Sequence, residues 1–136
     1  MQIYESGENY LETIYILTTT KNPVRSIDIV RRMNFSKPTV SVAMRNFRDE
    51  GYILIDENGY ITLTEKGLKI AKRVYNRHQL LTDALIAIGV SRENAEADAC
   101  KIEHDISEET MLCIQKHMQI HLKKSAPQTE LSAEER

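Results

Sequence analysis

The first half of the chain alternates short apolar runs with polar turns in a pattern typical of helices. Across residues 6–20, apolar side chains recur at helical spacing on the face opposite Asn9 and Glu12, which predicts a first amphipathic helix. After the polar turn at residues 21–23, Ser26 is placed to cap a second helix that runs to about Met33. Two consecutive helices joined by a tight turn are therefore expected.

A third helix is predicted after the connection Asn34-Phe35. Ser36 precedes it as a cap, and Pro38 falls in its first turn, where the missing N–H of proline is tolerated. Three apolar residues of this helix share one face, namely Val40, Met44 and Phe47. The polar side chains Thr39, Ser41, Arg45 and Arg48 are left on the other side, available to a partner.

Two β-prone runs follow this helix. They are Tyr52-Ile53-Leu54-Ile55 and Tyr60-Ile61-Thr62-Leu63, separated by the turn sequence Asp56-Glu57-Asn58-Gly59. Asn-Gly between such runs is a strong signal for a β-hairpin. Three helices followed by a hairpin form a winged helix-turn-helix, whose third helix enters the major groove of DNA.

The candidate DNA-binding residues lie around the third helix. Hydroxyl and cationic side chains suit phosphates and base edges, and those predicted here, together with the proline of the first turn, are Ser36, Lys37, Pro38, Thr39, Ser41, Arg45 and Arg48. Arg31 and Arg32 are further candidates for the DNA backbone, and Lys66 for the rim of the groove.

The second half of the chain is predicted to be helical throughout. A long helix begins at Thr64 and ends near Gly89, and Ser91 and Ser107 are candidate caps for two further helices over about 92–105 and 108–122. The last residues, 123–136, are polar and lack periodicity, so we expect a frayed tail. The expected fold is mainly α, with a winged helix-turn-helix over 1–73 and a helical domain over 74–122.

Composition supports this interpretation and adds a charge asymmetry. The 136 residues are 41% hydrophobic with only three prolines, and the net charge is -2. Residues 25–77 nevertheless carry eleven Lys or Arg against six Asp or Glu, a balance of +5 that leaves -7 for the remainder. A basic segment suits contact with nucleic acid, and the acidic remainder suits a carboxylate-rich site. Winged helices also dock proteins, and that alternative stays open.

Other functional classes find little support in the sequence. No secretory leader and no apolar stretch long enough for a membrane span is seen, so a cytoplasmic protein is expected. Two cysteines, Cys100 and Cys113, are too few for a disulfide framework and are expected to be thiols or ligands. Phosphate-binding loops, nucleophile elbows and H-E-x-x-H motifs are all missing from the sequence. We therefore expect no enzyme.

The run ACKIEHDIS brings three types of metal-ligating side chain close together. Cys100, Glu103 and His104 are spaced i, i+3 and i+4, which places them on one face of a helix. A polar face with an incidental cysteine is the alternative. His78, with Glu12 and Asn9 of the first helix, are candidates to complete the shell, although spacing does not show that they meet. His117 and His121 also stand at i and i+4, but a structural role is favoured for them.

Five runs, quoted in chain order, carry a family resemblance: NYLETIY, FSKPTVS, GYITLTEKG, RHQLL and ACKIEHDIS. Over about residues 4–115 the chain resembles the diphtheria-toxin-repressor-like family of iron- and manganese-dependent repressors. The resemblance implies that residues 74–122 form a dimerisation and metal-sensing domain. It also implies a homodimer that binds pseudo-palindromic operator DNA when loaded with Mn²⁺ or Fe²⁺ and controls metal homeostasis genes. The chain is short for the iron-responsive members, so it looks like the two-domain manganese type.

Carried over by position, the resemblance implies Cys100, Glu103 and His104 as ligands, with Asn9 as the ligand from the first helix. It also implies His78 as an ancillary ligand and Glu12 as one typical of the manganese branch. Cys100 is the iron-type residue, Asn9 stands where relatives have Met or Asp, and the iron-type ancillary site has changed at Thr82 and Glu96. A thiolate shifts preference from Mn²⁺ toward Fe²⁺, and toward Zn²⁺ or Cu²⁺ in vitro. A winged-helix regulator that responds to an organic ligand or to cysteine oxidation is the alternative function.

Overall fold

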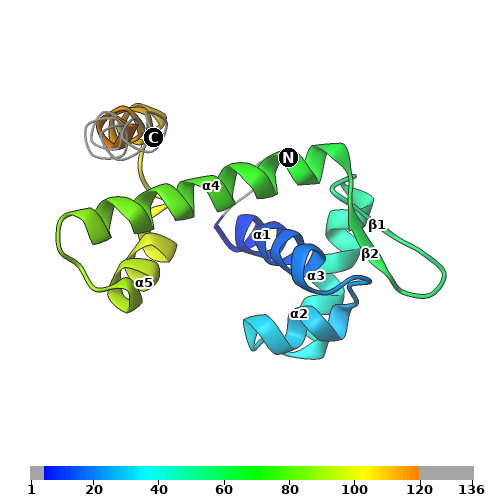
Figure 1. The fold of residues 1–136 in the computed structure, drawn as a ribbon. Helices are drawn as coiled ribbons and strands as arrows, with labels where there is room; N and C mark the ends of the chain where they lie inside the picture. Colours follow the sequence, from blue (N-terminus) through cyan, green and yellow to red (C-terminus); the bar gives the residue numbers. More distant parts are fainter. Residues whose placement is uncertain (1–4, 120–136) are drawn as a thin grey trace, which may run out of the picture. The chain divides into compact units, whose positions relative to one another are not determined.

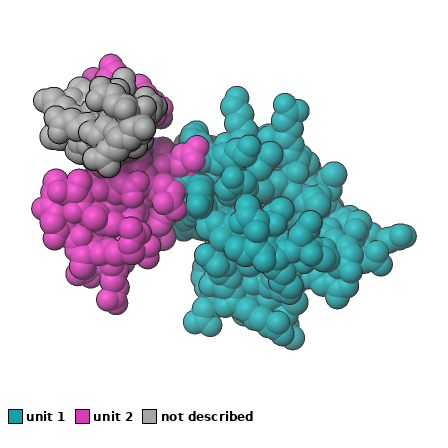
Figure 2. Space-filling view, viewed as in Figure 1, with its two compact units in different colours: residues 1–75 teal, residues 76–136 magenta. Residues whose placement is uncertain are grey.

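The computed structural model of the chain describes residues 5–119. Two compact units divide the chain, residues 1–75 and residues 76–136, and Figure 2 colours them separately. Within the described residues the regular secondary structure is helical apart from one two-stranded sheet. This confirms the predicted fold class. The predicted tail over 123–136 lies outside the described residues, as does His121.

The first unit contains three helices, a hairpin and the start of a long helix (Figure 1). In chain order these are α1 (Glu5–Thr20), α2 (Ser26–Met33), α3 (Lys37–Asp49), β1 (Ile53–Ile55), β2 (Ile61–Leu63) and α4 (Glu65–Ala87). The strands are antiparallel, with Ile53 opposite Leu63. Helix α2 packs on both α1 and α3 around one apolar core that includes Leu11, Ile29 and Val40. The winged helix-turn-helix is therefore formed as predicted.

The caps of the helix-turn-helix differ in part from the prediction. Ser36 caps α3 by accepting a hydrogen bond from the Thr39 N–H at 3.3 Å, as expected. The prediction that Ser26 caps α2 was wrong, because the N-cap residue is Arg25. The Asp28 carboxylate accepts the Arg25 N–H at 2.9 Å and also pairs with Lys21. At the N-terminus of α2, a carboxylate in the first turn therefore accepts a backbone N–H, where a serine hydroxyl was expected to do so.

The β1–β2 hairpin, which forms the wing, contacts the residues just before α2. Its second strand extends to Val24 through an antiparallel bridge at Ile61. The Arg25 guanidinium donates to the Tyr60 hydroxyl at 3.1 Å and stacks on the same ring, 4.7 Å from its centroid. At the tip, the Asp56 carboxylate accepts two backbone N–H bonds at 2.9 Å each. The hairpin is thus held at both ends, which fixes where its turn projects.

The end of α3 is joined tightly to the start of α4. The Thr64 hydroxyl donates to the Gly51 carbonyl at 2.7 Å and accepts the Gly67 N–H at 3.2 Å, so it caps α4. Gly67 lies so close to Tyr52 that a β-carbon there would meet the Tyr52 carbonyl oxygen at 2.1 Å. Only glycine fits at this position without movement of the backbone.

The second unit contains the later part of α4, helix α5 (Arg92–Ile102) and a further helical segment at residues 108–119. Gly89 has φ 108° and follows the end of α4, as predicted. Ser91 caps α5 as expected. The expectation that α5 runs to residue 105 was wrong. Its last bonds tighten at Asp105, which donates to the Ile102 carbonyl three residues back.

A small apolar cluster holds the helices of this unit together. Leu81 of α4, Ala99 of α5 and Met111 of the last helical segment are buried against one another. The Arg77 guanidinium adds a hydrogen bond to the Ile106 carbonyl at 2.8 Å. Among the described residues, no helix has the length and apolar character needed to cross a membrane.

Candidate DNA-binding face and metal centre

The polar residues predicted for DNA contact lie on the exposed side of the α3 region. Val40, Met44 and Phe47 are buried, which turns the opposite face of the helix outward. The exposed residues are Ser36, Lys37, Pro38, Thr39, Ser41, Arg45 and Arg48. Ser36 and Thr39 also bond each other through their hydroxyls at 2.7 Å, and Arg48 pairs with Asp49 at 3.3 Å.

The polar face of α3 also contains an apolar residue that was not predicted from the sequence. Val42 is 48% exposed on α3, between the exposed Ser41 and Arg45 in helical order. The three inward residues already fill the apolar face of this helix, so Val42 projects away from the core. Its position in the helical repeat was the available signal, because it falls outside the buried stripe.

The second unit brings one carboxylate and two imidazoles together. Glu103 is only 1% exposed and follows directly after α5. Its Oε2 lies 3.0 Å from Nδ1 of His78, which α4 contributes. Its Oε1 lies 3.2 Å from Nε2 of His104, whose side chain is 3% exposed. Three of the six predicted metal ligands are therefore neighbours, and two of them are buried.

The donor set of this cluster fits a divalent metal ion. Within the described residues, Oε1 of Glu103 is buried and accepts no hydrogen bond, despite its proximity to His104. A carboxylate oxygen left in this state is unfavourable in a protein interior unless a cation or donor compensates it. The imidazoles of His78 and His104 lie next to the carboxylate. In this arrangement, no group of three or more His, Cys, Asp or Glu in residues 5–119 is placed so that it could hold a metal ion.

The other predicted ligands occupy different surroundings. Cys100 is exposed on α5. Asn9 and Glu12 lie one turn apart on α1, in the first unit, where Asn9 is half-buried and Glu12 is 8% exposed. Whether these three side chains join His78, Glu103 and His104 around one ion stays a prediction.

Fold and clustered side chains together define a winged-helix DNA-binding protein whose second, helical unit carries ligand-type residues. Comparison with protein families agrees with this class. Residues 2–60 match the model described as the N-terminal DNA binding domain of iron dependent repressors. Residues 64–125 match the model described as their metal binding and dimerisation domain.

Individual relatives support the same assignment. The HTH-type transcriptional regulator MntR of Geobacillus kaustophilus is 36% identical over 102 residues, which are 75% of this chain and 72% of the relative. An uncharacterized HTH-type transcriptional regulator of Methanocaldococcus jannaschii is 30% identical over 109 residues, 79% of this chain and 87% of the relative. The chain belongs to the iron-dependent repressor family.

Solved structures agree with the fold. The manganese regulator SloR superposes with a TM-score of 0.73 at 25% identity, over 88% of this chain and 55% of that chain. A manganese-dependent transcriptional repressor solved in complex with manganese gives 0.73 at 26% identity, over 82% of this chain and 52% of that chain. This chain thus spans about half the length of these solved relatives. The resemblance to the diphtheria-toxin-repressor-like family is confirmed.

Proposed function

We propose that this chain is a metal-dependent transcriptional repressor. It binds pseudo-palindromic operator DNA as a homodimer when loaded with Mn²⁺ or Fe²⁺, and it controls genes of metal homeostasis in the cytoplasm. The observation that carries the proposal is the buried Glu103 carboxylate flanked by His78 and His104. This cluster belongs to a chain whose other unit is a winged helix-turn-helix.

The cluster supports metal binding through its charges. The Glu103 carboxylate is buried and its Oε1 accepts no hydrogen bond within the described residues, so a cation placed beside it would compensate a group that is otherwise unfavourable in the interior. A divalent ion would supply two positive charges and act as a Lewis acid toward oxygen and nitrogen donors. His78, Glu103, His104 and Cys100 are the residues that would hold it in the second unit. Asn9 and Glu12 are the ligands that family resemblance implies on α1.

The two units give the proposed switch its two parts. The first unit exposes Lys37, Arg45 and Arg48 around a helix that suits the major groove. The second unit holds four of the six proposed ligands, namely His78, Cys100, Glu103 and His104, and the continuous helix α4 runs from one unit into the other. Metal therefore needs to favour a DNA-binding arrangement by only a few kcal/mol to change operator occupancy strongly. No catalytic step is part of this function.

The choice of metal depends on Cys100. With a thiolate in the shell, we expect metal preference to shift from Mn²⁺ toward Fe²⁺ and, in vitro, toward Zn²⁺. The substitution Cys100→Glu would replace a soft thiolate donor with a hard carboxylate donor. We expect this variant to bind Mn²⁺ more tightly relative to Zn²⁺ than the unmodified protein does, as measured by competition with a chromophoric chelator.

Fluorescence anisotropy with a labelled duplex tests the proposal. The duplex is first selected from a random-sequence pool by the Mn²⁺-loaded protein, and binding is then titrated with Mn²⁺, with anaerobic Fe²⁺, and with chelator. We expect metal to tighten binding by about 10- to 100-fold, the usual range of allosteric coupling. Glu103→Gln should lose this response, whereas Glu109→Gln, which changes an exposed glutamate of the last helical segment, should keep it.

Two results would contradict the proposal. The first is duplex binding that is equally tight with Mn²⁺, Fe²⁺ and chelator. The second is a metal response that persists unchanged in Glu103→Gln and in His104→Ala. Metal-independent binding that changes on thiol oxidation or with a small organic molecule would instead support the alternative regulator.

A further inference from the structure

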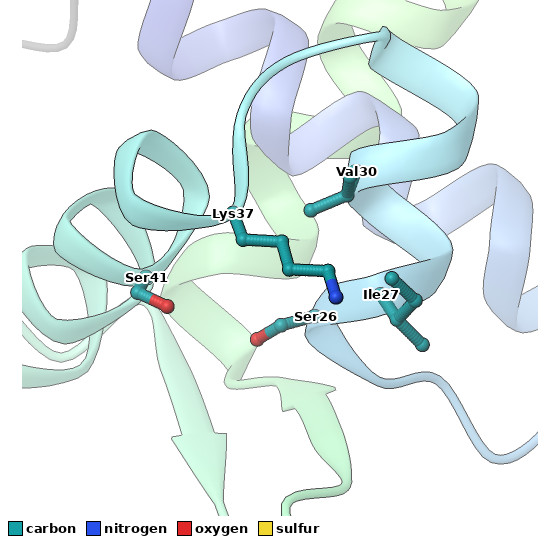
Figure 3. Close-up of a pocket in the computed structure, with 5 residues that line it drawn as sticks. All are labelled: Ser26, Ile27, Val30, Lys37 and Ser41. Carbon is teal, nitrogen blue, oxygen red and sulfur yellow. The ribbon is translucent and has the colours of Figure 1, made fainter.

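A hollow of about 310 Å³ opens between the two helices of the helix-turn-helix (Figure 3). Helix α2 lines it with Ser26, Ile27 and Val30, and helix α3 lines it with Lys37 and Ser41. Its wall is therefore part apolar and part polar, with one cationic side chain. Lys37 and Ser41 were expected to meet DNA, but Ser26 and the hollow itself were not.

The polar groups of the hollow converge on the same space. Figure 3 shows Lys37 extending from the start of α3 across to α2, so that its ammonium lies beside Ser26 and Ile27. The hydroxyls of Ser26 and Ser41 point toward each other from opposite sides. Within residues 5–119 none of these three side chains makes a hydrogen bond or an ion pair. Their donors are available to a ligand.

The residues that line the hollow include one cationic side chain, Lys37, and no acidic one. The nearest acidic residue on α2, Asp28, already accepts the Arg25 N–H and pairs with Lys21. Lys37 is exposed and has no carboxylate partner in the described part of the chain. One ammonium and two hydroxyls form a donor set that matches the oxygens of a phosphate.

We propose that this hollow holds one backbone phosphate of the operator DNA. In this arrangement the Lys37 ammonium and the hydroxyls of Ser26 and Ser41 donate to the phosphate oxygens. Ile27 and Val30 pack against the neighbouring deoxyribose. The inference rests on the proposed function, because it assumes that the duplex approaches the exposed face of α3.

The position of Lys37 favours a phosphate over a base edge. Base contacts come from side chains that project from the outer face of a recognition helix into the groove, where Arg45 and Val42 are exposed. Lys37 instead turns back toward α2 (Figure 3). A contact of this kind fixes the position of the duplex and adds affinity without sequence preference.

The test uses the metal-loaded, full-length protein and the selected duplex. Single phosphates are replaced one at a time by neutral methylphosphonates, and each duplex is bound by the unmodified protein, by Lys37→Gln and by Ser26→Ala/Ser41→Ala. Lys116→Gln is the matched control, because it removes one exposed lysine from the second unit. Salt dependence is measured for each protein on the unmodified duplex.

We expect one methylphosphonate position per half-site at which the unmodified protein loses about tenfold in affinity, as for a charged hydrogen bond. At that position Lys37→Gln should lose less than about twofold further, because its contact is already absent. Lys37→Gln should also lower the slope of log affinity against log salt by about 1. Lys116→Gln should leave the slope and the methylphosphonate pattern unchanged. The double serine variant should bind the unmodified duplex more weakly and, like Lys37→Gln, should lose little further at that position.

Three outcomes would overturn the inference. One is a Lys37→Gln slope equal to that of the unmodified protein. Another is a methylphosphonate pattern that is the same in Lys37→Gln and the unmodified protein. The third is a changed base preference at one position in Lys37→Gln, which would assign Lys37 to a base edge. If the unmodified protein binds no duplex in response to metal, the proposed function fails instead.

Discussion

Replacement of Gly67 by alanine should destabilise the first unit, although alanine is the better helix former. The added β-carbon would lie 2.1 Å from the Tyr52 carbonyl oxygen and 3.0 Å from its carbonyl carbon. That carbonyl cannot turn away freely, because it accepts the Thr64 N–H at 3.1 Å. The substitution therefore forces the start of α4 away from the end of α3.

The magnitude follows from two opposing effects. Overpacking of a tight contact costs about 1–3 kcal/mol, and the forced shift weakens the Thr64 bonds to Gly51 and Tyr52, each worth about 1 kcal/mol. The helix propensity of alanine returns roughly 1 kcal/mol. We expect a net loss of about 2 kcal/mol in the free energy of unfolding.

Urea denaturation followed by circular dichroism measures this loss. Lys69→Ala is the matched control, since it introduces alanine at an exposed position of the same helix, and it should change the free energy of unfolding by less than about 0.5 kcal/mol. A Gly67→Ala protein as stable as the unmodified protein, or more stable, would refute the reasoning. Such a result would mean that the junction between α3 and α4 yields without losing its hydrogen bonds.

Three further predictions concern the same unit. Asp28→Asn should lower the free energy of unfolding by about 1–3 kcal/mol at neutral pH. The hydrogen bond from Lys21, offset in part by burial and reinforced by the Arg25 N–H, holds the pKa of Asp28 below its ordinary value. The carboxylate therefore stabilises the fold above about pH 4. In urea melts at a series of pH values, the difference in stability between the variant and the unmodified protein should shrink as pH falls through the lowered pKa. Tyr60→Leu, which removes both contacts between the Arg25 guanidinium and Tyr60, should weaken duplex binding severalfold in anisotropy titrations, because these contacts hold the hairpin to the residues before α2. Tyr60→Phe, which keeps the stacked ring, should have the smaller effect. If the exposed Val42 contacts the methyl group of a thymine, exchange of that thymine for uracil in the selected duplex should weaken binding by a few fold. Val42→Ala should remove this difference, and equal sensitivity of both proteins to the exchange would contradict the contact between Val42 and the methyl group.

Local signals in the sequence were sufficient for most elements of the fold. Ser36 and Ser91 cap their helices, and Gly89 ends α4, because each depends on backbone groups within a few residues. Ser26 failed as a cap for a related reason. The competing carboxylate of Asp28 stands only two residues further on, and it satisfies the N-terminus more strongly than a hydroxyl does.

The candidate metal centre was predictable only in part. The spacing of Glu103 and His104 identified them as potential ligands, but it placed them inside a helix, whereas α5 ends at Ile102. Burial of Glu103 and its proximity to His78 depend on how α4 packs against α5, over a separation of 25 residues. No periodicity within one segment contains that information, because a tertiary contact determines it.

The burial of Glu103 is difficult to explain as a device for stability. A carboxylate that is 1% exposed loses several kcal/mol of hydration, and well-packed apolar residues often serve a core at least as well as a buried ionic pair. Among the described residues of this unit, the buried apolar cluster consists of Leu81, Ala99 and Met111, with Leu80, Ile106 and Ile114 packed against it, and Glu103 adds nothing to that apolar burial. An arrangement that is unfavourable on its own and favourable with a cation is what a metal switch requires, because ion binding then stabilises the loaded state selectively. Under the proposed function, the buried Glu103 carboxylate is therefore the group through which ion binding would stabilise the loaded state.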